Sequence, residues 1–216
     1  MSIFDPATIQ GQTMRGDWLV FLAASVVVAI LVYAFILAPL IVWRRRSEGL
    51  PPQFSGNGPL EIGVVIASLL LVGGLFYVTY VREMPVDAVA PHPDRTIDVT
   101  AFRWSWEFDY PGSGIHIVGT PQRPPELVLP QGESTEIALR SVDVTHSFWV
   151  PDFLFKRDAI PGMVNRFDLT PVKNGRFRGL CAQFCGLDHA LMTFTVRVVP
   201  PAAYRAWISA GGRTPA

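Results

Sequence analysis

Two long apolar runs occupy the first part of the chain. Neither the run Trp18–Trp43 nor the run Ile62–Val81 contains a charged residue. A helix needs roughly 20 apolar residues to cross the hydrocarbon core of a bilayer. We therefore predict a transmembrane helical hairpin over residues 18–84, with spans at 18–43 and 61–82. The alternatives are a cleaved signal sequence for the first run and a buried core helix for the second. The first run is longer than the apolar core of roughly 7–15 residues that signals carry.

Basic residues between the two runs indicate the orientation of the hairpin. Arg44, Arg45 and Arg46 follow the first run directly, and short loops rich in arginine stay in the cytoplasm. We therefore expect a bacterial inner membrane protein. Its N-terminal segment, residues 1–17, and everything after the second span then lie on the periplasmic side.

After about residue 90 the pattern changes to short runs in which apolar and polar residues alternate. The clearest runs are TEIALR (135–140), RFDLT (166–170) and TFTVRVV (193–199). A period of two is typical of half-buried strands. We predict an all-β sandwich or barrel over residues 90–200, followed by a tail, 201–216, with a short helix.

Composition changes this picture little. Hydrophobic residues make up 50% of the 216 residues, and the formal net charge is zero. A neutral chain gives no reason to expect nucleic acid as a partner. The residues after position 85 hold equal numbers of acidic and basic side chains. Electrostatic attraction of a partner must therefore be local.

The candidate chemistry lies in one loop, CAQFCGLDHALM. Cys181 and Cys185 are the two cysteines of the chain, and His189 and Met192 follow them within the same loop. A second imidazole is available at His146. Thiolate, imidazole and thioether together suit copper, because zinc rarely takes methionine. A second thiolate suggests two metal ions that share bridging sulfurs. The alternative is a disulfide, which the oxidising periplasm permits.

This loop resembles the CuA-binding loop of cytochrome c oxidase subunit II, with its pattern C-x-[EQ]-x-C-G-x-x-H-x-x-M. The segments HSFWVP, RDAIPG and RWSWEFDY also resemble that family. Two N-terminal spans followed by an exported β domain match its layout. The resemblance implies a membrane-anchored all-β protein whose exported part is a cupredoxin-like Greek-key β-barrel.

The resemblance also implies the ligands of a binuclear copper centre. Cys181 and Cys185 bridge the two copper ions, and His146 and His189 each bind one of them. Met192 is a weak axial ligand, and the backbone oxygen of Gln183 is the other. Many members have glutamate where this chain has Gln183, and that carboxylate helps to bind an interface Mg²⁺. Magnesium prefers carboxylate and water, so the substitution leaves the magnesium ion open.

By the same resemblance, the chain is an electron-transfer subunit of a terminal respiratory oxidase. It takes electrons from cytochrome c, or a similar small donor, at Trp104. It passes them to haem in subunit I, where O2 is reduced to water and protons are translocated. Subunit III and membrane lipid are further expected partners. Four carboxylates are candidates for a ring that steers a basic donor to Trp104, with ordinary surface charge as the alternative: Glu107, Asp109, Asp152 and Asp188.

Two further acids have roles that the resemblance implies. Glu61 corresponds to a residue at the mouth of a proton channel in subunit I, and Asp158 to a contact with subunit I. Ordinary interfacial and turn positions are the respective alternatives.

Two other functions remain compatible with the residues. The same dicopper domain serves copper-dependent nitric oxide reductases. A protein of a different class, for copper delivery or storage, also binds copper through sulfur. Such a protein usually has methionine-rich or open sites, whereas this chain has only five methionines.

Overall fold

Two long helices begin the chain in the computed structural model. Helix α1 spans Ile9–Val42 and helix α2 spans Gly58–Asp87. Both are long and apolar enough to cross a membrane, and none of the most apolar 18-residue stretch of either is buried inside the protein. Large apolar side chains therefore face outward along both helices, as a lipid environment requires. Near the start of α1, Asp17 accepts a hydrogen bond at 3.0 Å from Arg82 of α2.

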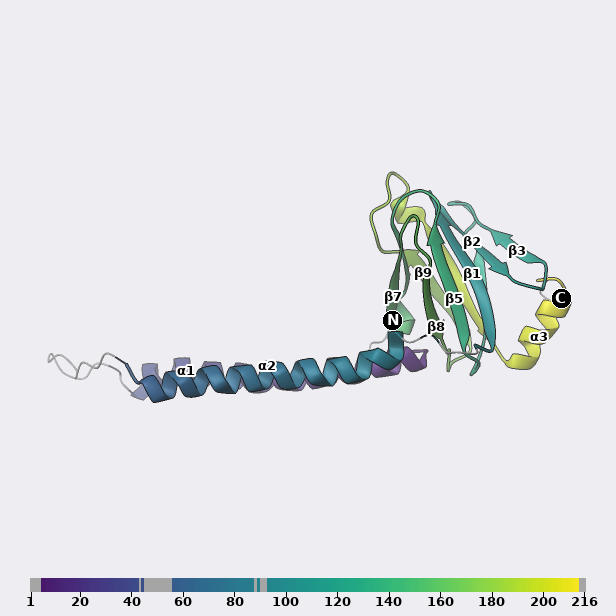
Figure 1. The fold of residues 1–216 in the computed structure, drawn as a ribbon. Coiled ribbons are helices and arrows are strands. Elements are labelled where there is room, and N and C mark those ends of the chain that lie inside the picture. The colour runs from purple at the N-terminus through teal and green to yellow at the C-terminus, as the bar shows by residue number, and fades with distance from the viewer. Residues whose placement is uncertain (1–4, 43, 45–55, 88, 90–92, 214–216) are drawn as a thin grey trace. The chain divides into compact units, whose positions relative to one another are not determined.

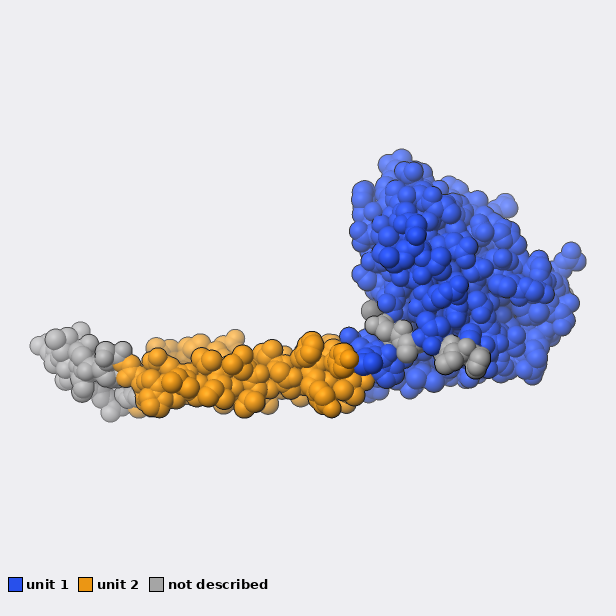
Figure 2. Space-filling model, in the orientation of Figure 1, with its two compact units in different colours: residues 1–15, 83–216 blue, residues 16–82 orange. Residues whose placement is uncertain are grey.

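The structure describes residues 5–42, 44, 56–87, 89 and 93–213. Arg45 and Arg46, most of the loop that follows them and the last three residues of the tail lie outside these ranges. The chain forms two compact units, which Figure 2 colours separately. One comprises residues 16–82, and the other comprises residues 1–15 together with 83–216.

The second unit is built on two five-stranded sheets (Figure 1). The first sheet has the strand order β3-β2-β1-β5-β8. Its strands are β1 (Arg95–Phe102), β2 (Ser105–Tyr110), β3 (Ile115–Val118), β5 (Thr135–Ser141) and β8 (Asn165–Leu169). Strands β1 and β5 run parallel, with Ile97 opposite Ile137, and the other pairs in this sheet are antiparallel.

The second sheet has the order β4-β10-β9-β6-β7. Its strands are β4 (Glu126–Pro130), β6 (His146–Val150), β7 (Phe155–Ala159), β9 (Gly175–Cys181) and β10 (Thr193–Val199). A 3-10 turn, Pro151–Phe153, joins β6 to β7. Helix α3 (Pro201–Ser209) follows β10, where the sequence predicts a short helix.

Aromatic side chains from both sheets meet in the core between them. Trp106 of the first sheet lies 5.2 Å from Phe194 of the second, centroid to centroid, and Phe194 stacks on Phe148 at 4.8 Å. All three are essentially inaccessible to solvent. Such aromatic contacts add to the stabilisation from buried area. The predicted alternating runs at 135–140, 166–170 and 193–199 correspond to β5, β8 and β10, and their alternate apolar residues supply this core.

The segment before α1 is bonded to the β domain. The Ala7 N–H donates to the Asp152 carbonyl at 2.9 Å, and the Val172 N–H donates to the Ala7 carbonyl at 2.8 Å. The Thr8 hydroxyl donates to the Phe153 carbonyl at 3.1 Å. The sequence pattern gave no indication of these contacts, because they join residues more than 140 positions apart.

Candidate metal centre

Three strand ends converge on the loop that holds both cysteines. Cys181 ends β9, His146 begins β6, and β10 begins at Thr193, directly after Met192. Because β6 runs antiparallel to β9, with Phe148 opposite Cys181, the beginning of β6 lies beside the end of β9. The Cys181 N–H donates to the Met192 carbonyl at 2.9 Å and closes the loop.

The six predicted ligands lie together in this loop and its neighbouring strand. The sulfur of Cys181 lies 3.8 Å from His146 Nδ1, 3.9 Å from the sulfur of Cys185 and 3.1 Å from the Gln183 carbonyl oxygen. The sulfur of Cys185 lies 3.5 Å from His189 Nδ1 and 3.7 Å from the Met192 sulfur.

The donor atoms fit a soft metal ion. Metal–sulfur bonds of about 2.3 Å at tetrahedral angles place two sulfurs about 3.8 Å apart, which matches the 3.9 Å between the cysteine sulfurs. A disulfide needs about 2.05 Å, and both cysteines are free thiols. The donors of His146, Cys181 and Cys185 all lie within 4.8 Å of one another. Two thiols, two imidazoles and a thioether suit copper better than an oxygen-preferring ion.

The two thiols ionise differently. For Cys181, burial opposes ionisation, but its contacts with His146 and with the backbone of Ser147 and Gln183 outweigh burial and lower the pKa of the thiol. Burial, followed by the charge of neighbouring Cys181, raises the pKa of the Cys185 thiol to about 12. Because a metal binds the thiolate form, loading the site must release the Cys185 proton.

Trp104 lies against the metal loop. Its indole N–H donates to the Cys185 carbonyl at 3.2 Å, and its ring is half-buried. The ring also covers Gly186, where an added Cβ would lie 3.2 Å from the indole nitrogen. Gly186 has φ +120°, a backbone conformation that residues other than glycine rarely adopt. Glycine at this position therefore permits the contact between Trp104 and the loop. Trp106, by contrast, is fully buried in the core.

The four carboxylates of the predicted ring come from three separate segments of the β domain. His146 begins β6, whereas Asp152 lies beyond the other end of that strand, where its carbonyl bonds Ala7. Glu107 lies on β2 with its carboxylate 3.8 Å from His116 Nδ1. Asp188 is the member that belongs to the metal loop itself.

Glu61 and Asp158 lie in other parts of the chain. Glu61 is in the first turn of α2, where its carboxylate accepts from the Asn57 N–H at 3.3 Å, and Asn57 Oδ1 accepts from the Leu60 N–H at 3.3 Å. This is helix N-capping. Asp158 lies on β7, opposite Ser147 of β6. One carboxylate oxygen of Asp158 is buried without a hydrogen-bond partner among the described residues.

One contributor to the site was not foreseen from the sequence. Asp143 Oδ1 lies 2.8 Å from His146 Nε2. Burial opposes ionisation of this carboxyl, but His146 and the N–H groups of Val144 and Arg103 outweigh burial and lower its pKa to about 2. The spacing Asp-x-x-His was visible in the sequence as a signal, but the contact depends on how the chain turns before β6.

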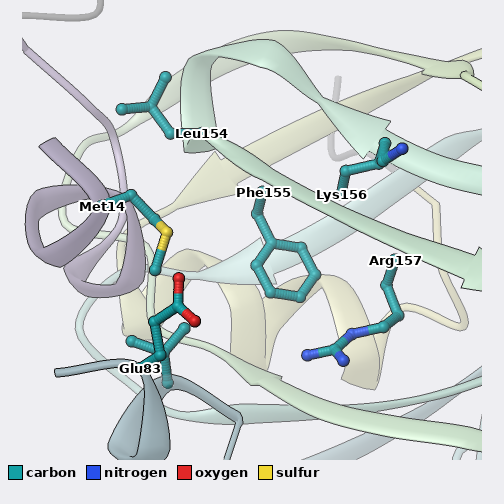
Figure 3. Close-up of a pocket in the computed structure, with 7 residues that line it drawn as sticks. Met14, Glu83, Leu154, Phe155, Lys156 and Arg157 are labelled. Carbon is teal, nitrogen blue, oxygen red and sulfur yellow. The ribbon is translucent and has the colours of Figure 1, made fainter. Parts of the chain in front are cut away.

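A separate cavity of about 250 Å³ lies in the β-domain unit (Figure 3). Residues 154–157, which lead into and form most of β7, line it together with Met14, Glu83 and Val86. None of these residues is a predicted metal ligand.

Comparisons with known proteins agree on one family. The family model described as "Cytochrome C oxidase subunit II, periplasmic domain" matches residues 121–199. A probable cytochrome c oxidase subunit 2 of Streptomyces avermitilis is 36% identical, over 88% of this chain and 71% of that protein. Cytochrome c oxidase subunit 2 of Mycobacterium bovis is 31% identical, over 93% and 72%. The crystal structure of the periplasmic domain of subunit II of cytochrome oxidase (CoxB) of Bradyrhizobium japonicum superimposes with a TM-score of 0.52 at 31% identity. That match covers 57% of this chain and 96% of the other.

Proposed function

Because the chain belongs to the cytochrome c oxidase subunit II family, we propose that its periplasmic domain holds two copper ions and conducts electrons to the oxidase. Members of this family are subunits of an oxidoreductase complex. The β domain of this chain has the cupredoxin-like fold of the family's periplasmic domain. Cys181 and Cys185 bridge the two ions in this proposal.

The arrangement of the imidazoles is the observation that carries the proposal. His146 Nδ1 lies 3.8 Å from the sulfur of Cys181, and His189 Nδ1 lies 3.5 Å from the sulfur of Cys185. Each sulfur therefore has an imidazole of its own, while the sulfurs lie 3.9 Å apart. One imidazole for each of two ions, with both sulfurs shared, accounts for this arrangement.

The remaining two donors complete the centre. The Gln183 carbonyl oxygen lies on the Cys181 side and the Met192 sulfur on the Cys185 side, so each ion gains one weak ligand. The Gln183 side chain lacks the carboxylate that magnesium prefers, so an interface magnesium ion is not part of this proposal.

Bound copper would supply a one-electron redox couple shared over two ions. The net charge of such a shared centre is small, so burying it costs less free energy than burying two separate ions. The protein holds the ligands still. The cysteines and Met192 are buried, and the His146 side chain is fully enclosed. Ligands that keep their positions need little rearrangement when an electron arrives or leaves.

The partners follow from this role. Cytochrome c, or a similar small donor, delivers electrons at Trp104, and haem in subunit I receives them for the reduction of O2 to water. Subunit III and membrane lipid complete the surroundings. Glu61 serves proton uptake into subunit I. Asp158, which is half-buried on β7, contacts subunit I in this proposal.

The test is the rate at which electrons reach copper through Trp104. We expect Trp104→Phe to slow reduction of the copper-loaded full chain by reduced cytochrome c, because the hydrogen bond to the Cys185 carbonyl is lost. The copper absorption spectrum should stay the same. Stopped-flow absorption measures the rate, and Trp149→Phe on β6 is the matched control. Equal rates for Trp104→Phe and the unmodified chain would remove Trp104 from the path.

A further inference from the structure

The carboxylate of Asp143 lies directly behind one of the proposed ligands. His146 Nε2 is 2.8 Å from Asp143 Oδ1, while Nδ1 on the other side of the ring faces the sulfur of Cys181. A carboxylate only accepts hydrogen bonds, so Nε2 of His146 carries the proton. The lone pair of Nδ1 is then free to bind a metal. The His146 side chain is fully enclosed, and Asp143 is 20% exposed.

The same carboxylate also binds the turn between β1 and β2, which carries Trp104. Asp143 Oδ2 accepts from the Arg103 backbone N–H at 2.8 Å and from its side-chain Nε at 3.3 Å. Arg103 immediately precedes Trp104, whose indole bonds the Cys185 carbonyl. The Asp143 side chain thus links the imidazole of His146, which lies beside Cys181, to the turn that carries Trp104, which lies beside Cys185.

We propose that Asp143 is a positioning residue for the copper centre. It fixes the ring of His146, makes this imidazole a stronger ligand for copper, and anchors the β1–β2 turn that carries Trp104. This rests on the proposed function. A carboxylate behind a ligating imidazole orients the ring and raises its basicity. Its negative charge also favours the more oxidised, more positive state of the metal.

The first variant removes the charge and keeps the shape. Asp143→Asn retains an oxygen for His146 but loses the carboxylate. We expect the midpoint potential of the copper centre to rise. Resistance to a copper chelator should fall by about tenfold or more, within the range usual for partners behind a metal ligand. The coupling of the unpaired electron to one histidine nitrogen should also change in electron–nuclear double resonance.

The chain offers a matched control. Asp98, on β1, pairs with Arg140 at 2.8 Å and has 31% of its side chain exposed. Asp98→Asn therefore breaks an aspartate–arginine pair of the same kind without touching a proposed ligand. The potential and copper retention of Asp98→Asn should equal those of the unmodified chain.

A second variant keeps the proposal testable if Asp143→Asn does not fold. Arg103→Gln leaves the backbone N–H bond and the Asp143–His146 contact in place, but removes a cation from the carboxylate. Its potential should fall, opposite in sign to the shift for Asp143→Asn. A purely structural role for Asp143 gives no reason for shifts of opposite sign.

The measurements use the full chain, purified in detergent and loaded with copper. If the unmodified chain shows an electron shared by two coppers while Asp143→Asn matches Asp98→Asn, the role of Asp143 is overturned and the proposed function stands. An unmodified chain with no shared electron overturns the proposed function, and the role of Asp143 with it.

Discussion

The Met192 thioether is the proposed weak ligand of the centre, so its removal tests whether the copper ions stay bound without it. Its sulfur lies 3.7 Å from that of Cys185, and the side chain is fully buried. The resemblance to the family's metal loop indicated the six proposed ligands, five of which lie within that loop. It did not indicate the contact between Asp143 and Arg103, because these residues are 40 positions apart.

Replacing Met192 with leucine should leave both coppers bound and raise the midpoint potential. Leucine has a similar volume, so repacking should cost less than about 1.5 kcal/mol. Loss of the thioether that would bind copper should disfavour the oxidised metal. Metal analysis and redox titration of the full chain measure the two effects. Met163→Leu, at a half-exposed site outside the loop, is the control. Loss of one copper in Met192→Leu would show that the thioether is a principal ligand.

Among the elements, β2 and β4 belong to different sheets and are joined by one hydroxyl group. The Tyr110 hydroxyl accepts from the Val128 N–H at 2.8 Å and donates to the Val128 carbonyl at 3.3 Å. The ring of Tyr110 also lies 5.0 Å from that of Trp207 in α3. Alternation along the sequence predicts which strands exist and which face each one buries. It does not predict which backbone groups a side chain in the other sheet will bond.

Replacing Tyr110 with phenylalanine should destabilise the β domain by about 1–3 kcal/mol, because the buried Val128 N–H loses its partner. Urea unfolding of the full chain in detergent, followed by tryptophan fluorescence, measures the change. Tyr77→Phe on α2, where the side chain is largely exposed, should change little. Equal stability of the two variants would contradict the importance of this bond.

Alkaline pH should destabilise the same region. Burial, the largest effect, raises the pKa of Tyr204 to about 12 and also raises the pKa of Tyr110. An unfolded tyrosine ionises near pH 10. The contribution of these groups to stability is therefore complete below about pH 10 and is lost as pH rises towards their folded-state pKa values.

Tyr204→Phe should make this alkaline loss of stability shallower between about pH 10 and pH 12. Urea unfolding at a series of pH values tests it, with Tyr77→Phe again as the control. An alkaline slope unchanged by Tyr204→Phe would mean that Tyr204 is already accessible to hydroxide in the folded protein.

At the scale of the whole molecule, the chain consists of two membrane spans and a periplasmic domain. The predicted helices correspond to α1 and α2, since length and lack of charge are enough to identify them. The attachment of residues 7–9 to the β domain was not predictable, because so short a segment carries no periodic signal. Its hydrogen bonds fix this segment to the β domain within the same compact unit.

The orientation of the hairpin should place both ends of the chain outside. Alkaline phosphatase, which is active only in the periplasm, should be active when fused after Ala216 and inactive when inserted within the loop 47–55. A green fluorescent protein should show the reverse pattern, which controls for expression. Phosphatase activity from the loop fusion would contradict the orientation predicted from Arg44, Arg45 and Arg46.

Counting the metal ions in the copper-loaded full chain, together with its electron paramagnetic resonance spectrum, tests the dicopper account most directly. We predict two coppers per polypeptide and a single unpaired electron coupled equally to both nuclei, and we predict that Cys185→Ser abolishes this coupling. Zinc in place of copper, or one copper with a localised signal, would contradict it.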